Sequence, residues 1–258
     1  MNKYHTSVFL IGLFMLTLVA CQPQSSSLKK EQQRDELTSA IAKLTSQVDL
    51  IQKQVNDIHE VAIQSQKPKV KKLADQENFN ANGTLPSLGD DTAKIAMIEF
   101  SDFQCPYCKR YIDQTFPLIS KNYIEQGKVK YLIRDYPLSF HPKAQGAAIA
   151  SICAQQQGNY WPFRNNLFNN MNELDQSYYI ELSQKLQLDT PLFAQCLNEK
   201  SHLVKINNDV ALGKSLGVTG TPSFIIGRIE NNVLVVPQLI IGAQSYRSFS
   251  YILNELGK

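Results

Sequence analysis

The sequence lacks the marks of several large protein classes. Its formal net charge is only +3, which is too small to indicate a nucleic-acid partner. It contains no P-loop, no glycine-rich dinucleotide loop and no internal repeat, so nothing in it points to a nucleotide cofactor or to a repeat protein. The apolar run over residues 8–18 is too short for a membrane span. We therefore expect no cofactor and no nucleic acid.

Cysteine is also scarce. Among five cysteines, only Cys105 and Cys108 form a C-x-x-C pair. A single pair could be half of a zinc site, but there is no second pair, and His141 and His202 lack the spacing of a ligand pair. We therefore predict no metal site. A merely structural bridge is the other alternative, although small structural loops rarely place two cysteines at a strand-to-helix junction.

The pair lies where a strand is expected to end and a helix to begin. The apolar run 95–100 predicts a buried strand, and residues 109–119 predict the helix. Cys105 would then lie at the helix N-terminus, where unpaired N–H groups and the macrodipole favour a thiolate, and Pro106 suits the first helical position. Cys108 lies one turn further on and could close a small disulfide ring with Cys105. A low pKa would make Cys105 a good leaving group and the ring more oxidising.

Residues 1–20 are predicted to be a signal peptide with a short apolar region. They end in Leu18-Val19-Ala20, which together with Cys21 resembles a bacterial lipobox, so we expect Cys21 to be lipidated. The alternative is ordinary secretory cleavage that leaves an unmodified cysteine. Because Gln22 and not Asp follows Cys21, the lipoprotein sorting pattern implies the outer rather than the inner membrane. In either case we expect the chain to leave the cytoplasm for a compartment in which disulfides can persist.

A polar tract over residues 29–66 contains neither glycine nor proline and predicts a long helix. Its apolar residues alternate in steps of four and three, as in a coiled-coil seam: Leu37, Ile41, Leu44, Val48, Ile51, Val55 and Ile58. The narrow seam favours a homodimer through residues 28–66, and the alternative is a helix that docks on its own domain. Residues 21–66 are thus interpreted as a lipid-anchored helical segment, and residues 67–84 as a linker.

The rest of the chain, residues 85–258, predicts an α/β domain. Further strands are expected over residues 128–134, 223–229 and 233–241, with Asn231-Asn232 as the turn between the last two. Ser245 is expected to cap a final amphipathic helix. Apolar spacing near 3.6 predicts helices over residues 143–157, 162–171, 178–186, 191–197 and 203–216.

Two segments of this domain resemble one family. Ile98-Glu99-Phe100-Ser101-Asp102-Phe103-Gln104-Cys105-Pro106-Tyr107-Cys108 closely resembles the active-site segment of DsbA-like thioredoxin-fold proteins. Far downstream, Gly217-Val218-Thr219-Gly220-Thr221-Pro222-Ser223-Phe224 resembles the cis-proline loop of that family. The resemblance implies a thioredoxin fold with a helical domain inserted at about residues 140–215, and it implies a thiol-disulfide oxidoreductase.

The resemblance also implies roles for three residues of the first segment. Cys105 would be the nucleophile and Cys108 the resolving thiol. Family members carry a buried acid at the position of Glu99, and a buried carboxyl can take or relay the proton that Cys108 loses. The alternative for Glu99 is a partly exposed acid at the end of a strand.

The substrate-binding loop is expected to consist of Thr221 and Pro222, with Pro106 and Tyr107 beside it. By resemblance, the backbone of Thr221 pairs with an extended substrate like an added strand. Threonine before the proline is more typical of DsbC-type isomerases than of DsbA. Pro106-Tyr107 also replaces the Pro-His of DsbA, which removes one stabiliser of the thiolate, so we do not expect the strongest oxidising power.

The remaining two cysteines, Cys153 and Cys196, are candidates for a second, structural disulfide inside the insert. The alternative is two independent buried thiols. The whole chain is then an envelope enzyme that forms or isomerises disulfides in cysteine-containing exported proteins, with a redox partner that re-oxidises or reduces the Cys105–Cys108 pair. A reductase would differ only in that partner. A non-catalytic envelope lipoprotein that uses the scaffold for binding is the alternative from another class.

Overall fold

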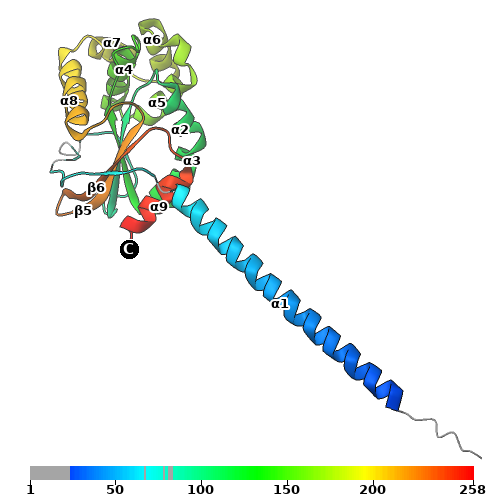
Figure 1. Ribbon diagram of the computed structural model, residues 1–258. Coiled ribbons are helices and arrows are strands. Elements are labelled where there is room, and N and C mark those ends of the chain that lie inside the picture. The colour runs from blue at the N-terminus through cyan, green and yellow to red at the C-terminus, as the bar shows by residue number, and fades with distance from the viewer. Residues whose placement is uncertain (1–23, 67, 78, 81–83) are drawn as a thin grey trace, which may run out of the picture. The chain divides into compact units, whose positions relative to one another are not determined.

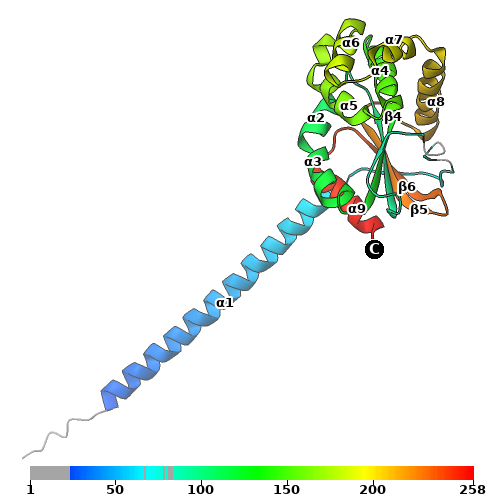
Figure 2. The same cartoon turned by 180° about the vertical axis from the view of Figure 1, so that it is seen from behind.

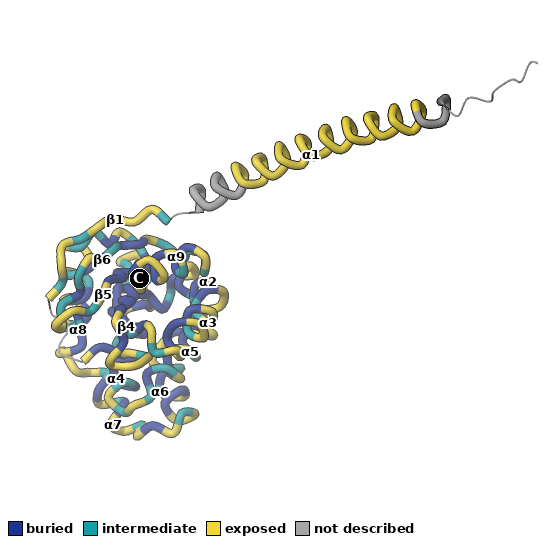
Figure 3. Tube along the Cα trace, turned by 90° about the horizontal axis from the view of Figure 1, so that it is seen from below, coloured by how far each residue is buried: buried dark blue, intermediate teal, exposed yellow. Residues whose placement is uncertain are grey.

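The computed structural model describes residues 24–66, 68–77, 79–80 and 84–258, and it divides into two units between Ala62 and Ile63. The described part of the first unit is helical throughout and belongs to helix α1 (Gln24–Gln66) (Figure 1). The apolar side chains of the predicted seam are all 52–69% exposed, and residues 28–58 are exposed throughout (Figure 3). Within the described ranges, no helix combines the length and the apolar character that crossing a membrane requires.

The second unit is built on a six-stranded sheet with the order β1-β6-β5-β3-β4-β2. Strands β3 and β4 run parallel, with Ile98 opposite Leu132, and the other neighbouring pairs are antiparallel. The bounds are β1 (Lys71–Lys72), β2 (Ser87–Leu88), β3 (Ile95–Ser101), β4 (Val129–Asp135), β5 (Ser223–Glu230) and β6 (Val233–Ile241). Every residue of β3 is buried, which is expected for a strand with neighbours on both edges and cover on both faces.

Five helices are inserted between β4 and β5, and α4 to α7 gather at one end of the sheet (Figures 1 and 2). They are α4 (Ala144–Gln156), α5 (Tyr160–Asn169), α6 (Gln176–Lys185), α7 (Thr190–Cys196) and α8 (Lys200–Leu216), with a short 3-10 turn at Met171–Glu173. The other helices are α2 (Pro106–Gln114), α3 (Phe116–Ile119), a π-helical turn at Ser120–Ile124, and α9 (Tyr246–Leu256).

Alternate residues of β3 enter two different cores, because side chains alternate across a strand. Met97 packs in a core with residues of α2, α3 and α9, whereas Ile98 and Phe100 pack in a core that reaches α8. A third core fills the insert and includes Cys105 and Cys108. Cys105 and Cys108 therefore lie where the sheet meets the inserted helices.

The observed elements confirm the predicted α/β fold with a helical insert. Asn231 and Asn232 both have positive φ, at 50° and 62°, as a tight hairpin turn requires, and the Ser245 hydroxyl accepts from the Ser248 amide to cap α9. Strands β1 and β2 were not expected. β1 lies within the segment interpreted as a linker, and it pairs with the edge of β6 through its backbone while its lysine side chains stay exposed.

Candidate active site

Helix α2 begins directly behind the end of β3. Cys105 is its N-cap, in extended conformation and without a side-chain capping bond, and Pro106 follows in the first turn. The Cys105 amide donates to the Asp102 carbonyl at 3.1 Å, and the Lys109 amide donates to the Cys105 carbonyl at 3.2 Å. The Asp102 carboxylate also accepts from the Gln104 amide at 2.7 Å. These bonds hold the turn that places the Cys105 sulfur at the N-terminal end of the helix.

Both cysteines of the pair are free thiols, and both are buried: Cys105 is 2% exposed and Cys108 is fully buried. Tyr107, between them, is 56% exposed, with the Arg110 guanidinium 5.0 Å from the centre of its ring. Tyr107 therefore presents an accessible aromatic ring next to the two buried thiols.

The pKa values of the two thiols are shifted in opposite directions. Hydrogen bonding from Cys108 is the main cause that lowers the pKa of Cys105 to about 6, with smaller contributions from Thr221 and from the first backbone amides of α2, while burial acts against them. Burial raises the pKa of Cys108 well above its ordinary value, and the hydrogen bond with Cys105 and the charge of Glu99 raise it further. At neutral pH the pair therefore holds one thiolate, on Cys105, and one thiol, on Cys108.

Glu99 lies fully buried on β3, on the same face as α2. Its carboxylate accepts from the Ser101 hydroxyl at 2.7 Å and from the Tyr131 hydroxyl, and it pairs with the Arg164 guanidinium at 2.9 Å. The alternative of a partly exposed acid is therefore wrong. The charge that Glu99 directs at Cys108 is held by three donors, one of them cationic.

Arg164 is the residue that sequence reasoning missed. It comes from α5 of the insert, is fully buried, and lies 5.3–5.7 Å from the ring centres of Phe116, Trp161 and Phe168. Within the described residues, its Nε and one terminal nitrogen have no hydrogen-bond partner. The signal was present, because Arg164 falls on the buried stripe of α5, whose other members are Tyr160, Phe163, Leu167 and Phe168.

The second expected motif lies against the first. Helix α8 ends at Gly217, which has a φ of 93°, and the chain then enters a loop with a cis peptide bond between Thr221 and Pro222. The Cys105 sulfur lies 3.4 Å from the Thr221 carbonyl oxygen. The loop is held to the residue that follows β6, because the Gly242 amide donates to the Pro222 carbonyl at 2.8 Å. Cys105, Cys108, Thr221 and Pro222 thus form one site.

A loop histidine also approaches this site. His141 Nδ1 lies 2.8 Å from an oxygen of Asp102, and the Leu138 amide donates to the same oxygen at 2.8 Å. Asp102 therefore joins the loop after β4 to the turn before Cys105. Beside His141, the side chain of Phe140 is 71% exposed.

The other two expected cysteines, Cys153 and Cys196, form a disulfide between α4 and the end of α7. The disulfide joins positions 43 residues apart within the insert. Cys21, the expected lipidation site, lies outside the described residues.

Comparison with known proteins gives a consistent set of relatives. A family model described as thioredoxin matches residues 81–234, a range that includes the C-x-x-C pair and the cis-proline loop. The crystal structure of Wolbachia pipientis alpha-DsbA1 is 30% identical with a TM-score of 0.57, and the match covers 67% of this chain and 92% of that one. Probable disulfide bond formation protein D of Bacillus cereus is 29% identical over 160 residues, which is 58% of this chain and 74% of the relative.

One group of relatives is much longer than this chain. The Na(+)/H(+) antiporter NhaA 3 of Salinispora tropica is 31% identical over 139 residues, or 54% of this chain. The match spans only 21% of the antiporter. The similarity is thus to one part of that protein.

Proposed function

The chain belongs to the thioredoxin family, in its DsbA-like branch, and we propose that it is an exported thiol-disulfide oxidoreductase that forms or isomerises disulfides through Cys105 and Cys108. The family match confirms the expected thioredoxin fold, and relatives named for disulfide bond formation support the enzyme class. One observation carries the proposal: two free, buried thiols lie at the start of helix α2, with the Cys105 sulfur 3.4 Å from the Thr221 carbonyl oxygen of the cis-proline loop.

In the oxidising direction, a substrate thiolate attacks Cys105 of the Cys105–Cys108 disulfide. The Cys108 sulfur leaves and takes up a proton, since its thiol form is strongly favoured. A second substrate thiolate then attacks the substrate sulfur of the mixed disulfide and expels the Cys105 thiolate, for which a pKa of about 6 makes a good leaving group. The substrate has lost two electrons and two protons: the enzyme holds both electrons in its reduced pair, one proton is on Cys108, and the other goes to solvent because Cys105 leaves as a thiolate.

Glu99 serves in this proposal as the proton partner of Cys108. Its buried charge disfavours the Cys108 thiolate, so Cys108 leaves the ring with a proton and loses that proton only when it acts as the resolving thiol. Arg164 keeps the carboxylate in place. The backbone of Thr221 and Pro222, together with the exposed Tyr107, would receive an extended cysteine-containing peptide.

Isomerisation follows from the same site when Cys105 is reduced, because its thiolate can attack a wrong substrate disulfide and later be expelled. Two features favour this activity beside oxidation: threonine before the cis-proline, and the exposed seam of α1, which would pair two copies of the chain. We further propose that lipidation at Cys21 holds the dimer in the cell envelope, with the outer membrane favoured. A redox partner there would re-oxidise or reduce the Cys105–Cys108 pair.

The direction of electron flow can be tested by equilibrating the full chain with glutathione buffers and reading the Cys105–Cys108 pair by alkylation and mass. A potential near about −120 mV would make oxidation the main activity, and one near about −180 mV or lower would favour isomerisation or reduction. If the pair does not cycle at all, the enzyme proposal is wrong and the scaffold serves for binding.

The dimer can be tested separately with Leu44→Lys combined with Ile51→Lys, two seam positions that are 60% and 58% exposed. Charges in the seam should convert a dimer into a monomer, because a buried seam does not accept unpaired lysines. Sedimentation measures this change in oligomeric state. Ser46→Lys combined with Asn56→Lys, two exposed positions on the face of the helix away from the seam, is the matched control. A substituted chain that still sediments as a dimer would contradict pairing through α1.

A further inference from the structure

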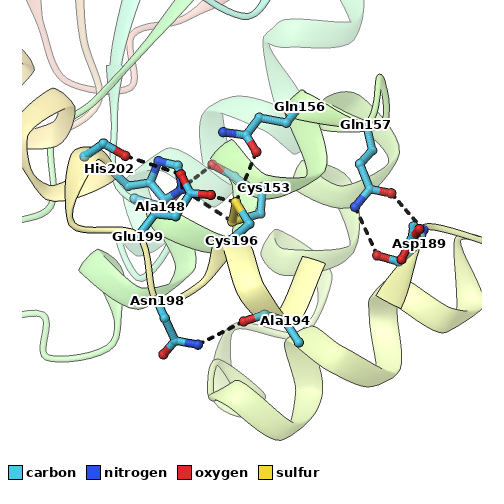
Figure 4. Close-up of a disulfide and its surroundings, with 12 residues drawn as sticks. Ala148, Cys153, Gln156, Gln157, Asp189, Ala194, Cys196, Asn198, Glu199 and His202 are labelled. Carbon is cyan, nitrogen blue, oxygen red and sulfur yellow. Dashed lines mark hydrogen bonds and ion pairs between the residues drawn. A yellow bond between two sulfur atoms is a disulfide. The ribbon is translucent and has the colours of Figure 1, made fainter. Parts of the chain in front are cut away.

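Three side chains with metal-binding atoms meet inside the helical insert (Figure 4). Cys153 comes from α4, Cys196 ends α7, and His202 lies in the first turn of α8. His202 Nε2 lies 3.1 Å from the Cys196 sulfur and 3.8 Å from the Cys153 sulfur. All three residues are buried, and their ligand atoms lie within 4.8 Å of one another. One imidazole nitrogen therefore faces both sulfurs of the disulfide.

The oxidised pair cannot bind a metal strongly, since each sulfur is bonded to the other and carries no negative charge. Reduction changes this. A dithiol reductant transfers two electrons and two protons to the Cys153–Cys196 bond and leaves as its own disulfide, so two thiols remain beside His202. When these thiols bind a metal they lose the two protons and become thiolates. Thiolate and imidazole are the ligands that Zn²⁺ prefers.

The spacing of the three atoms suits this ion. With Zn–S bonds of about 2.3 Å and Zn–N bonds of about 2.0 Å, a tetrahedral site has sulfur-to-nitrogen edges of about 3.5 Å. The observed separations of 3.1 Å and 3.8 Å lie on either side of that value. For the same tetrahedron the two sulfurs must separate to about 3.8 Å.

A carboxylate beside the histidine could supply a fourth ligand if its side chain turned toward the sulfurs, because it is not among the three ligand atoms that already lie within 4.8 Å of one another. Glu199, in the turn between α7 and α8, has a carboxylate oxygen 3.6 Å from His202 Nε2. Its side chain is 47% exposed, whereas that of His202 is only 5% exposed. Figure 4 shows the Glu199 side chain beside the imidazole. A ligand with one side in solvent gives the ion a route into an otherwise buried site.

We infer that the reduced insert is a zinc site formed by Cys153, Cys196 and His202, with Glu199 as the fourth ligand. The disulfide and the zinc complex are alternative states of the same two sulfurs. In either state α4 stays joined to the end of α7, and bound zinc prevents the two sulfurs from forming the disulfide again. This inference does not depend on the chemistry of the Cys105–Cys108 pair.

The test uses the full chain with Cys105→Ser and Cys108→Ser, so that the active-site pair binds no metal. The insert disulfide is reduced with a phosphine, which competes for zinc less than a dithiol does, and Zn²⁺ is titrated anaerobically against a chromophoric chelator. We expect one tightly bound Zn²⁺ per reduced chain and none per oxidised chain. A further Cys153→Ala, Cys196→Ala variant, which keeps Cys21, should bind none.

The role of the histidine is tested with His202→Gln in the same background, with circular dichroism as the check of folding. We expect at least about tenfold weaker Zn²⁺ binding, and a smaller loss for Glu199→Gln. Co²⁺ gives a second readout that needs no substitution of the histidine: the reduced chain should show thiolate-to-metal absorption and the bands of a tetrahedral site. The inference is overturned if the reduced chain binds no Zn²⁺, if the oxidised chain binds it equally well, or if His202→Gln binds it unchanged.

Discussion

The Cys105–Cys108 pair and the Cys153–Cys196 pair are equally buried, since none of these four cysteines is more than 2% exposed. They differ in their place on helices. Cys105 lies at the N-terminus of α2, where backbone N–H groups stabilise a thiolate, whereas Cys196 ends α7, where backbone carbonyls do the opposite. Burial alone therefore does not decide whether a cysteine pair reacts. Reactivity depends on the position of the cysteine on its helix and on the hydrogen bonds to its sulfur.

The largest difference between the pairs should appear in activity. Cys105→Ser should lower the oxidation rate of a reduced two-cysteine peptide by at least about 1,000-fold, the order of effect expected when a catalytic nucleophile is removed. The matched control is the Cys153→Ala, Cys196→Ala double variant, which should retain activity. Loss of activity in the control but not in Cys105→Ser would reverse the assignment of the two pairs.

The Glu99–Arg164 ion pair connects the sheet to the helical insert, since Glu99 lies on β3 and Arg164 on α5. Arg164→Met leaves the Glu99 carboxylate buried without its cation, and we expect the free energy of unfolding to fall by about 3–5 kcal/mol. Adding Glu99→Gln should recover part of this loss, because the unpaired charge is removed. Denaturant unfolding measures both. Equal stability of the single and double variants would show that the ion pair does not join the regions.

Removal of the Cys153–Cys196 disulfide should affect stability and leave the reactive thiol unchanged. The Cys153→Ala, Cys196→Ala variant should lose about 2–4 kcal/mol in free energy of unfolding, the usual range for a disulfide. The pKa of Cys105 should not move, since its causes lie in Cys108, Thr221 and the start of α2. Denaturant unfolding and alkylation of Cys105 on the same sample separate the two effects.

The smallest expected effect is a change in the pKa of Cys105 when its partner thiol is removed. Cys108→Ala removes the hydrogen bond that contributes most to lowering the pKa of Cys105, so that pKa should rise from about 6 toward its ordinary value. Each unit of the rise corresponds to about 1.4 kcal/mol. The pH dependence of alkylation measures it. An unchanged midpoint would mean that the helix N-terminus alone stabilises the thiolate.

Local patterns predicted much of this molecule. The buried strand before Cys105, Pro106 in the first turn of a helix, the Asn231-Asn232 turn and the Ser245 cap each depend on a few neighbouring residues. Strand β1 could not be found this way, because Lys71 and Lys72 join the sheet by backbone pairing and keep exposed side chains.

The contacts that complete the site come from residues far apart in the sequence. Arg164 meets Glu99 across 65 residues, and His202 meets Cys153 across 49. No spacing rule reports such pairs, since they depend on how the insert packs against the sheet. His141 and His202 lack the spacing of a ligand pair for the Cys105–Cys108 motif, and only the fold brings His202 to Cys153 and Cys196.

The most direct test of the account is the pH dependence of the alkylation rate of Cys105 in the full chain, with the insert disulfide intact. A thiolate with a pKa of about 6 predicts a rate that is half-maximal near that pH. Because the folded pKa lies below the ordinary value of about 8.5, the thiolate stabilises the folded dithiol form fully above that ordinary value, and this stabilisation is lost as the pH falls through the folded pKa. A midpoint near pH 8.5 would contradict the account, because Cys105 would then be an ordinary thiol.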